Sequence, residues 1–215
     1  MKIKIIITLH IIFANICLAQ DFNKFQKMFQ EVKIPFAVDS CSVEALVALD
    51  DSFPIIDRKM QNFIPVDLRE DIFKEQSVRA YYKFPLSENF VSLLILAASY
   101  EDGWRVTNSD FYLVNYDFDG HIIDYVKILR FYVECGHRWC TVNKNDIYVR
   151  AYEMDGRFDF DSAKGLPMTE GRYHYRIDQS GHFCREVEYS RSGYYKPSYN
   201  GCTFIFNCDF STEKK

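Results

Sequence analysis

Two stretches of the sequence repeat the pattern Asp-x-x-Gly-His, in YDFDGHIIDY at residues 116–125 and in IDQSGHF at residues 177–183. Alternating carboxylates before a glycine are typical of the start of a calcium loop, which also needs later oxygen ligands and a bidentate glutamate. Those later positions hold His121 and Val126 in the first stretch and Val187 in the second. Asp and Gly in this order are equally typical of a hairpin turn. We therefore predict two hairpin turns, with a metal loop as the alternative.

A second group of chemically capable residues lies in ECGHRWC, residues 134–140. It offers two thiols and an imidazole, the ligand types that zinc prefers, and Cys184 or His182 could complete a site. A thiol beside His137 could instead act as a nucleophile. Both alternatives need reduced thiols, whereas an exported chain favours disulfides. We predict that the two cysteines form a disulfide.

The first 19 residues have the features of a secretory signal peptide: a basic start, an apolar core and small residues just before Gln20. Residues 1–19 are therefore expected to be removed, and the protein to be periplasmic or extracellular. A membrane anchor and a lipid on Cys17 are the alternatives, but the apolar run is short and Ile16 is large for a lipid-attachment motif. No later run approaches transmembrane length, so we expect no span in the mature chain.

Six cysteines remain after removal of the signal peptide, and this even number suggests up to three disulfides. They are Cys41, Cys135, Cys140, Cys184, Cys202 and Cys208. Economy of spacing favours two local pairs and one long-range pair: Cys135–Cys140, Cys202–Cys208 and Cys41–Cys184.

Carboxylates are plentiful, and a glycosidase needs two of them facing each other across a cleft. The expected loop at residues 158–171 carries Asp159 and Asp161, and it could line a cleft with Tyr194 or Trp104. No nucleophile elbow, zinc-protease, P-loop or dinucleotide motif occurs in the chain. We therefore predict no catalytic residue, no metal and no cofactor, with a hydrolase of extracellular polymers as the alternative function.

Aromatic residues make up 17% of the chain, and several stand in polar surroundings. SGYYKPSYNG places three tyrosines in an expected loop, and DGWR contributes a tryptophan. Such residues either cover a β core or form surfaces that contact proteins and sugars. The predicted contact residues are Trp104, Tyr194, Tyr195 and Tyr199, and the predicted partner is a protein or a carbohydrate.

The charge balance argues against nucleic acid as a partner. The net charge is −4, and loss of the two lysines in the signal peptide lowers it to −6. A mildly acidic chain without a long run of Lys and Arg is a poor nucleic-acid binder.

The elements that must position these residues have mostly strand character. From Ala80 onward, eight segments have strand-like patterns, and several alternate cleanly. In DIYVRAYEM the apolar residues fall on one face, and Tyr148, Arg150 and Tyr152 fall on the other. Strands about ten residues apart, joined by short polar turns, predict an antiparallel meander that forms a sheet, a sandwich or a partial propeller.

Residues 20–79 are expected to form a helical and irregular flank that packs with the β region, residues 80–215, as one domain. The spacing in DFNKFQKMFQEVKIPF predicts an opening helix that proline ends, with an aromatic face that packs on the core: Phe22, Phe25 and Phe29. The predicted fold is therefore mainly β with a short helical N-terminal flank.

The order of these segments resembles a group of uncharacterised exported or lipid-anchored β-rich proteins of Bacteroidetes-type bacteria. The resemblance covers about residues 22–186 and lies in KIPFAVDS, IPVDLREDIF, YYKFPLSENFVSLLILAASYEDG, DFYLVNYDFDGHIIDYVKI and GRYHYRIDQSGHFCRE. It implies a β-rich exported protein with strand–turn–strand units, and it provides no activity to transfer. The chain departs from that group because it lacks a lipobox and has a cysteine-richer C-terminal end.

Together these observations favour an exported, non-catalytic binding or interaction protein. An immunity protein, which binds and blocks a secreted toxin, is one concrete form of that expectation.

Overall fold

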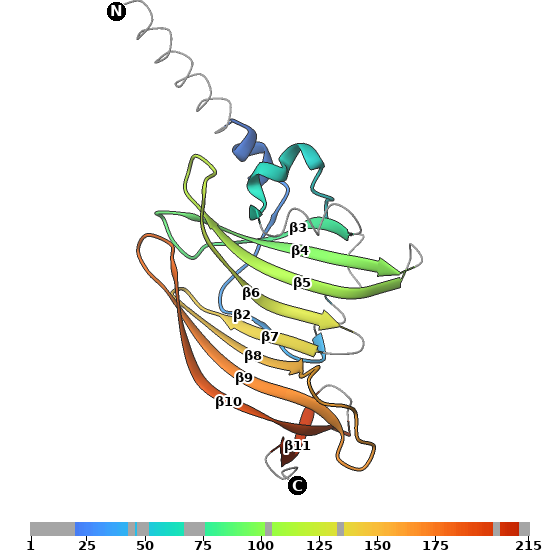
Figure 1. Ribbon diagram of the computed structural model, residues 1–215. Helices are drawn as coiled ribbons and strands as arrows, with labels where there is room; N and C mark the ends of the chain where they lie inside the picture. Colours follow the sequence, from blue (N-terminus) through green and yellow to red (C-terminus); the bar gives the residue numbers. More distant parts are fainter. Residues whose placement is uncertain are drawn as a thin grey trace, which may run out of the picture.

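In the computed structural model, eleven strands of the described residues form one open, mostly antiparallel sheet that curves strongly (Figure 1). The structure describes residues 20–42, 46, 52–66, 76–101, 105–132, 136–199 and 203–210. The prediction of a mainly β antiparallel meander with a short N-terminal helix is confirmed.

The strands follow one another along the chain as β1 (Gln30–Glu31), β2 (Phe36–Val38), β3 (Gln76–Phe84), β4 (Val91–Glu101), β5 (Arg105–Tyr116), β6 (Ile122–Tyr132), β7 (Gly136–Val142), β8 (Asp146–Met154), β9 (Leu166–Ile177), β10 (Phe183–Pro197) and β11 (Phe204–Asp209). Each strand from β3 to β10 pairs antiparallel with the next one. β1 adds a short parallel pair at β3.

The meander is interrupted between β6 and β7. These strands share only the residue pairs that join 130–132 to 136–138. β2 pairs with the other half of β7, at residues 140–142. The sheet therefore opens at this point, and β6 and β7 remain joined at one end only.

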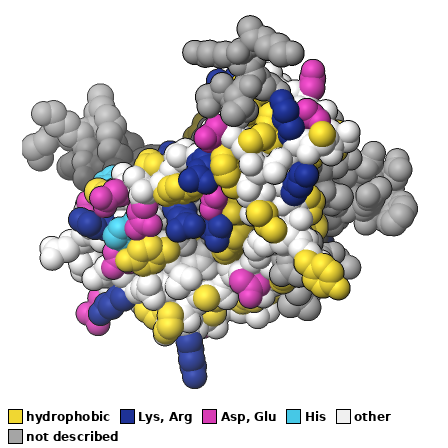
Figure 2. Space-filling model, turned by 90° about the horizontal axis from the view of Figure 1, so that it is seen from below, with side chains coloured by type: hydrophobic (Ala, Val, Ile, Leu, Met, Phe, Trp, Pro, Cys, Tyr) yellow, Lys and Arg dark blue, Asp and Glu magenta, His cyan; other side chains and the backbone are white. Residues whose placement is uncertain are grey.

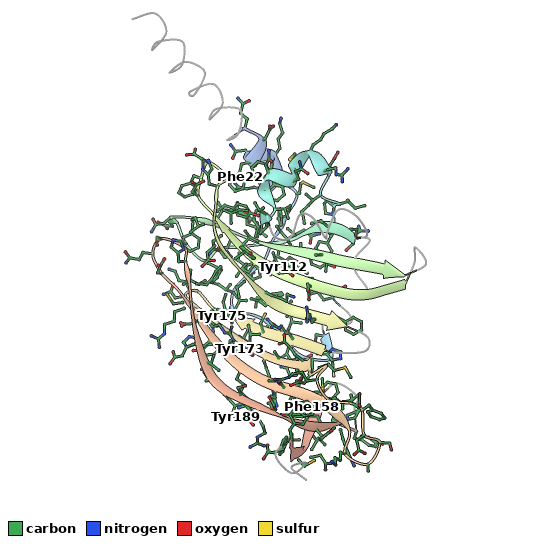
Figure 3. All side chains as sticks on the ribbon, viewed as in Figure 1. Phe22, Tyr112, Phe158, Tyr173, Tyr175 and Tyr189 are labelled. Carbon is green, nitrogen blue, oxygen red and sulfur yellow. The ribbon has the colours of Figure 1, made fainter. Side chains whose placement is uncertain are left out.

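The N-terminal helix, described over residues 20–26, packs on one face of β3–β5 (Figure 3). Its Phe22 and Phe25 are fully buried and contact the 3-10 helix η2 (Arg58–Phe63). Burial of each phenylalanine contributes roughly 1.5–3 kcal/mol, and the predicted aromatic face is confirmed. The helix is shorter than expected because the chain enters β1 at Gln30. Within the described ranges, no helix has the length and apolarity to cross a membrane.

Both faces of β4 are buried, because its sequence is apolar at nearly every position. Leu93 and Ile95 point toward the N-terminal helix, whereas Leu94 and Leu96 point into the main core. In that core the strands β3–β6 pack against β7–β9, including Tyr175. Side-chain alternation along each strand thus divides the apolar residues between two cores.

Two segments that were expected to be loops lie partly in strands. β9 begins at Leu166, inside the expected loop at residues 158–171, because this part of the segment pairs with β8 and β10. β10 continues to Pro197 through SGYYKP, where the sequence predicted a loop, because β11 pairs with this half of the strand. The flank also contributes more than helix, since β1 and β2 join the sheet and β3 begins at Gln76.

Candidate binding surface

Both Asp-x-x-Gly-His stretches are hairpin turns, as predicted. The Asp117 carboxylate accepts hydrogen bonds from the backbone N–H groups of Asp119, at 3.0 Å, and His121, at 2.8 Å. Asp178 holds the second turn in the same way. The glycines have left-handed φ angles of 92° at Gly120 and 94° at Gly181, which glycine adopts without a Cβ penalty. The turn chemistry therefore explains both the aspartate and the glycine.

The first turn also brings potential metal ligands together. Ligand atoms of Asp117, Asp119 and His121 lie within 4.8 Å of one another on the surface. The Asp117 carboxylate is already used by the turn, and its Oδ2 lies 2.9 Å from Nδ1 of His121. Burial works to raise the pKa of Asp117, but hydrogen bonds from His121 outweigh this effect and lower it. These contacts explain the group without an ion.

The second turn docks on the opposite half of the sheet. The Asn115 side chain in β5 donates a 2.7 Å hydrogen bond to the Gly181 carbonyl and accepts one of 2.7 Å from Ser92 in β4. The Phe183 N–H donates to the Asp124 carboxylate in β6 at 2.8 Å. The β9–β10 hairpin is therefore fastened across β4, β5 and β6.

A hollow of about 570 Å³ lies at this end of the sheet. Three turns line it, between β3 and β4, β7 and β8, and β9 and β10, with residues 85–90, 144–145 and 177–179. Its walls mix amide, charged and apolar side chains without an arrangement that selects one ligand chemistry.

The predicted disulfide pairs are wrong. Cys140, Cys184 and Cys208 have free thiols, and each of the three pairs required one of them. Cys140 lies inside β7 with its side chain in the main core, and burial raises the pKa of its thiol. The predicted partners Cys135 and Cys202 lie outside the described residues.

The zinc alternative is not supported by the part of the cluster that the structure describes. His137 contacts the rings of Phe131 and Phe204, whereas Cys140 points into the main core. Residues three apart in a strand face opposite sides of the sheet. One metal ion cannot be bound by both side chains in this arrangement.

Two of the four predicted contact residues are buried. Tyr194 and Tyr195 are 3% and 0% exposed, because the ring of Tyr194 packs against Phe210 and the ring of Tyr195 packs against Tyr152 and Phe206. Tyr199 is fully exposed, and Trp104 lies outside the described residues. The predicted loop surface is therefore wrong for Tyr194 and Tyr195.

The carboxylates of the loop between β8 and β9 line a hollow of about 540 Å³ together with Tyr194. Both Asp159 and Asp161 belong to this lining. Asp161 holds the turn of its own loop, since its carboxylate accepts the Ala163 N–H at 2.9 Å. The hollow matches part of the hydrolase alternative, but the two carboxylates belong to one loop and do not come from opposite walls.

A more extended surface lies on the side of β7–β10 that faces away from the main core. Strand register places Trp139, Arg150, Arg172 and Tyr189 in one cross-strand row, and Tyr148, His174 and Glu186 in the next. With the adjoining Glu170 and Arg191 we call this surface the arginine–aromatic face. Figure 2 shows the molecule from the side of β9–β11, where basic and apolar side chains lie next to one another. Tyr189 belongs to this outer side, whereas Tyr173 and Tyr175 pack toward the core (Figure 3).

A buried carboxylate organises one half of the face. The Glu170 side chain is 7% exposed, and it accepts a 2.8 Å hydrogen bond from Arg150. Arg172 lies 3.7 Å from the same carboxylate. The two guanidiniums also lie over aromatic rings, Arg150 at 5.6 Å from Trp139 and Arg172 at 5.3 Å from Tyr189. These ring contacts hold the arginine side chains against the sheet.

The other half is built around a stacked pair. Tyr148 and His174 lie parallel, with ring centroids 4.5 Å apart and an interplanar angle of 7°. His174 is fixed by Asp146, whose Oδ1 lies 2.7 Å from its Nε2. Tyr148 remains 43% exposed, so its outer ring surface and hydroxyl are available to a partner.

Between these halves lies a hollow of about 180 Å³, lined by Trp139, Thr141, Tyr148, Arg150, Arg172 and Glu188 among others. Ligand pockets usually enclose about 300–1,000 Å³, so this hollow has room for one group of a larger partner. Aromatic and arginine side chains around a small depression are the composition found at the centre of protein interfaces. This arrangement can bind a partner and fix its orientation. Among the described residues that line the hollow, no nucleophile is paired with a base.

No protein-family model, no curated protein and no solved structure matches the chain.

Proposed function

We propose that the protein is an exported, non-catalytic binding protein and that the arginine–aromatic face contacts its partner, a protein or a carbohydrate. The signal-like residues 1–19 support export. The observation that carries the binding proposal is the cross-strand row of Trp139, Arg150, Arg172 and Tyr189 around a buried glutamate. Binding and blocking of a secreted toxin is one concrete form of this function.

The side chains of the arginine–aromatic face are held in position before a partner binds, and this preorganisation favours binding. Arg150 is already held by Glu170 and lies over the ring of Trp139, so little side-chain entropy is lost when a partner binds it. Arg172 is half exposed, and it keeps donors available for acceptors on the partner. Rigid aromatic rings offer contact area at low entropic cost, both to apolar protein side chains and to sugar rings.

The proposal is tested with a double variant, Tyr148→Ala with Arg172→Ala, and with Tyr199→Ala as the matched control. Secreted proteins and polysaccharides from the native surroundings are screened individually, and binding is followed by calorimetry. Truncation of two central contact residues is expected to weaken binding at least tenfold, since such residues contribute about 2 kcal/mol each. Tyr199→Ala, on an exposed residue outside the face, is expected to bind normally. Unchanged affinity of the double variant would show that the face is not the contact surface.

The hollow beside Asp159 and Asp161 supports a second candidate, a hydrolase of extracellular polymers. If this candidate is right, the native protein releases products from a polymer substrate, and both Asp159→Asn and Asp161→Asn lose that activity. Turnover of a polysaccharide by the native protein, with loss in both variants, would replace the binding proposal.

A further inference from the structure

Five charged side chains form a compact cluster on strands β5–β8. On β7 and β8 the cluster lies on the side of the sheet opposite the arginine–aromatic face. We call it the ionic cluster, and it consists of Asp110, Lys127, Arg130, Arg138 and Glu153. Strand register explains its formation, because Asp110 lies opposite Arg130 and Arg130 lies opposite Arg138. Directly opposed residues share a face with Cβ atoms about 5 Å apart. Two arginines thus meet near the point where β6 and β7 join.

Two carboxylates hold the three cations in place. Asp110 accepts hydrogen bonds from Lys127 at 2.6 Å and from Nε of Arg130 at 2.7 Å. Glu153 accepts from Nε of Arg138 at 2.9 Å, and Arg138 also donates to the Lys127 carbonyl at 3.3 Å. The cations are therefore fixed in position before any ligand arrives.

The cluster carries one more positive than negative charge, in a chain whose net charge is −4. Like charges directly opposite each other on a sheet repel. The side chains of Arg130 and Arg138 are 25% and 17% exposed, so water screens this repulsion less than it does at the surface. The described hydrogen bonds use two of the five N–H donors of Arg130, three of the five of Arg138 and one of the three of Lys127. An anion would engage the remaining donors and relieve the repulsion.

We propose that Lys127, Arg130 and Arg138 bind an oxyanion, a phosphate or sulfate group that is either free or attached to a sugar. A guanidinium binds two oxygens of such a group at once. A tetrahedral oxyanion has enough oxygens to bridge both guanidiniums and the ammonium group. This site does not depend on the arginine–aromatic face.

The test is thermal unfolding of the protein in inorganic phosphate that replaces chloride at constant ionic strength. A ligand that binds only the folded state raises Tm. Once its concentration exceeds its dissociation constant, the rise grows with the logarithm of the concentration. The general stabilising effect of phosphate by exclusion from the surface acts on every variant alike. Isothermal calorimetry with phosphate supplies an independent saturation curve.

Arg138→Gln is expected to abolish the saturable heat and the corresponding part of the Tm rise. Arg176→Gln is the matched control, because it removes an exposed arginine that lies 3.4 Å from Glu186, away from the cluster. If Arg138→Gln does not fold, Arg138→Lys keeps the charge and is expected to weaken phosphate binding severalfold. A saturable response of the native protein that a folded Arg138 variant retains in full would overturn the proposal.

Two further probes identify the source of the oxyanion. Saturation by inorganic phosphate supports a free ion, and saturation by glucose 6-phosphate alone supports an oxyanion carried on a sugar. A response to glucose that equals the response to glucose 6-phosphate would overturn the proposal. So would the absence of saturable binding by both inorganic phosphate and glucose 6-phosphate.

Discussion

The fastening of the β9–β10 hairpin can be tested at Asn115, whose side chain links β4 and β5 to the turn between β9 and β10. Its amide donates to the Gly181 carbonyl, and its carbonyl accepts from the Ser92 hydroxyl, both at 2.7 Å. Asn115 is 0% and Ser92 is 1% exposed. Asn115→Ala removes both bonds and leaves two buried polar groups without these partners.

The expected cost follows from the desolvation of those groups. A buried donor or acceptor that loses its partner costs about 1–3 kcal/mol. Two such groups therefore lower the free energy of unfolding by about 3 kcal/mol in Asn115→Ala. For a chain of this length, that change corresponds to a decrease in Tm of about 6–12 °C.

The measurement is denaturant unfolding of the native protein, Asn115→Ala and the control Asn89→Ala. Asn89 is exposed and lies near the same turn, with a long 3.4 Å contact to the Gln179 carbonyl, so its loss is expected to cost less than about 0.5 kcal/mol. A Ser92→Ala, Asn115→Ala double variant should cost less than the sum of the single variants, because both remove one shared bond. Equal costs for the two asparagines, or strict additivity in the cycle, would refute the reasoning.

Three other changes probe the turn, the thiols and the ionic cluster. Gly120→Ala should lower the free energy of unfolding by about 2–4 kcal/mol, because the position has a φ of 92° and an added Cβ would lie 2.7 Å from the buried ring of Phe22. A denaturant titration measures this change. Gly156→Ala is the control, because an added Cβ meets open space there. Cys184 should react with a thiol reagent in the native protein, whereas Cys140 should react only after denaturation, and simultaneous reaction would contradict its burial. Burial works to raise the pKa of Asp110, but its arginine and lysine partners outweigh this effect and lower it, so its stabilising contribution is complete above about pH 4 and is lost as the pH falls through the lowered pKa. The stability difference between native protein and Asp110→Asn should therefore shrink in acid, and a constant difference from pH 7 to pH 2 would contradict this assignment.

The features that the sequence predicted well are those set by short-range chemistry. The left-handed glycines and the carboxylates at Asp117 and Asp178 determine the two hairpin turns locally. Alternation of side chains identified most of the strands, and the spacing of Phe22 and Phe25 identified the buried helix face. These signals lie within a few residues of one another, so they can be read without knowledge of the strand partners.

The features that the sequence could not provide depend on pairing between distant segments. Asn115 and Gly181 are 66 residues apart in the chain, and no local pattern indicates their hydrogen bond. The ionic cluster requires the register of four strands before Arg130 and Arg138 become neighbours. The predicted Cys135–Cys140 pair failed for the same reason, since short spacing suggested a disulfide although strand β7 directs the Cys140 side chain into the core.

The predicted contact residues show which sequence signal should have been given more weight. Tyr194 and Tyr195 stand next to glycine and proline, which suggested an exposed loop, but both lie in β10, and rings from other segments pack against them. In DIYVRAYEM, by contrast, the alternation had already placed Tyr148 and Arg150 opposite the apolar side. A strand with one apolar side turns its other side away from the core. The alternation of apolar and polar residues along a strand therefore specifies the direction of an aromatic side chain, whereas neighbouring glycine and proline residues do not. The positions of Tyr148 and Arg150 in the arginine–aromatic face follow from this alternation.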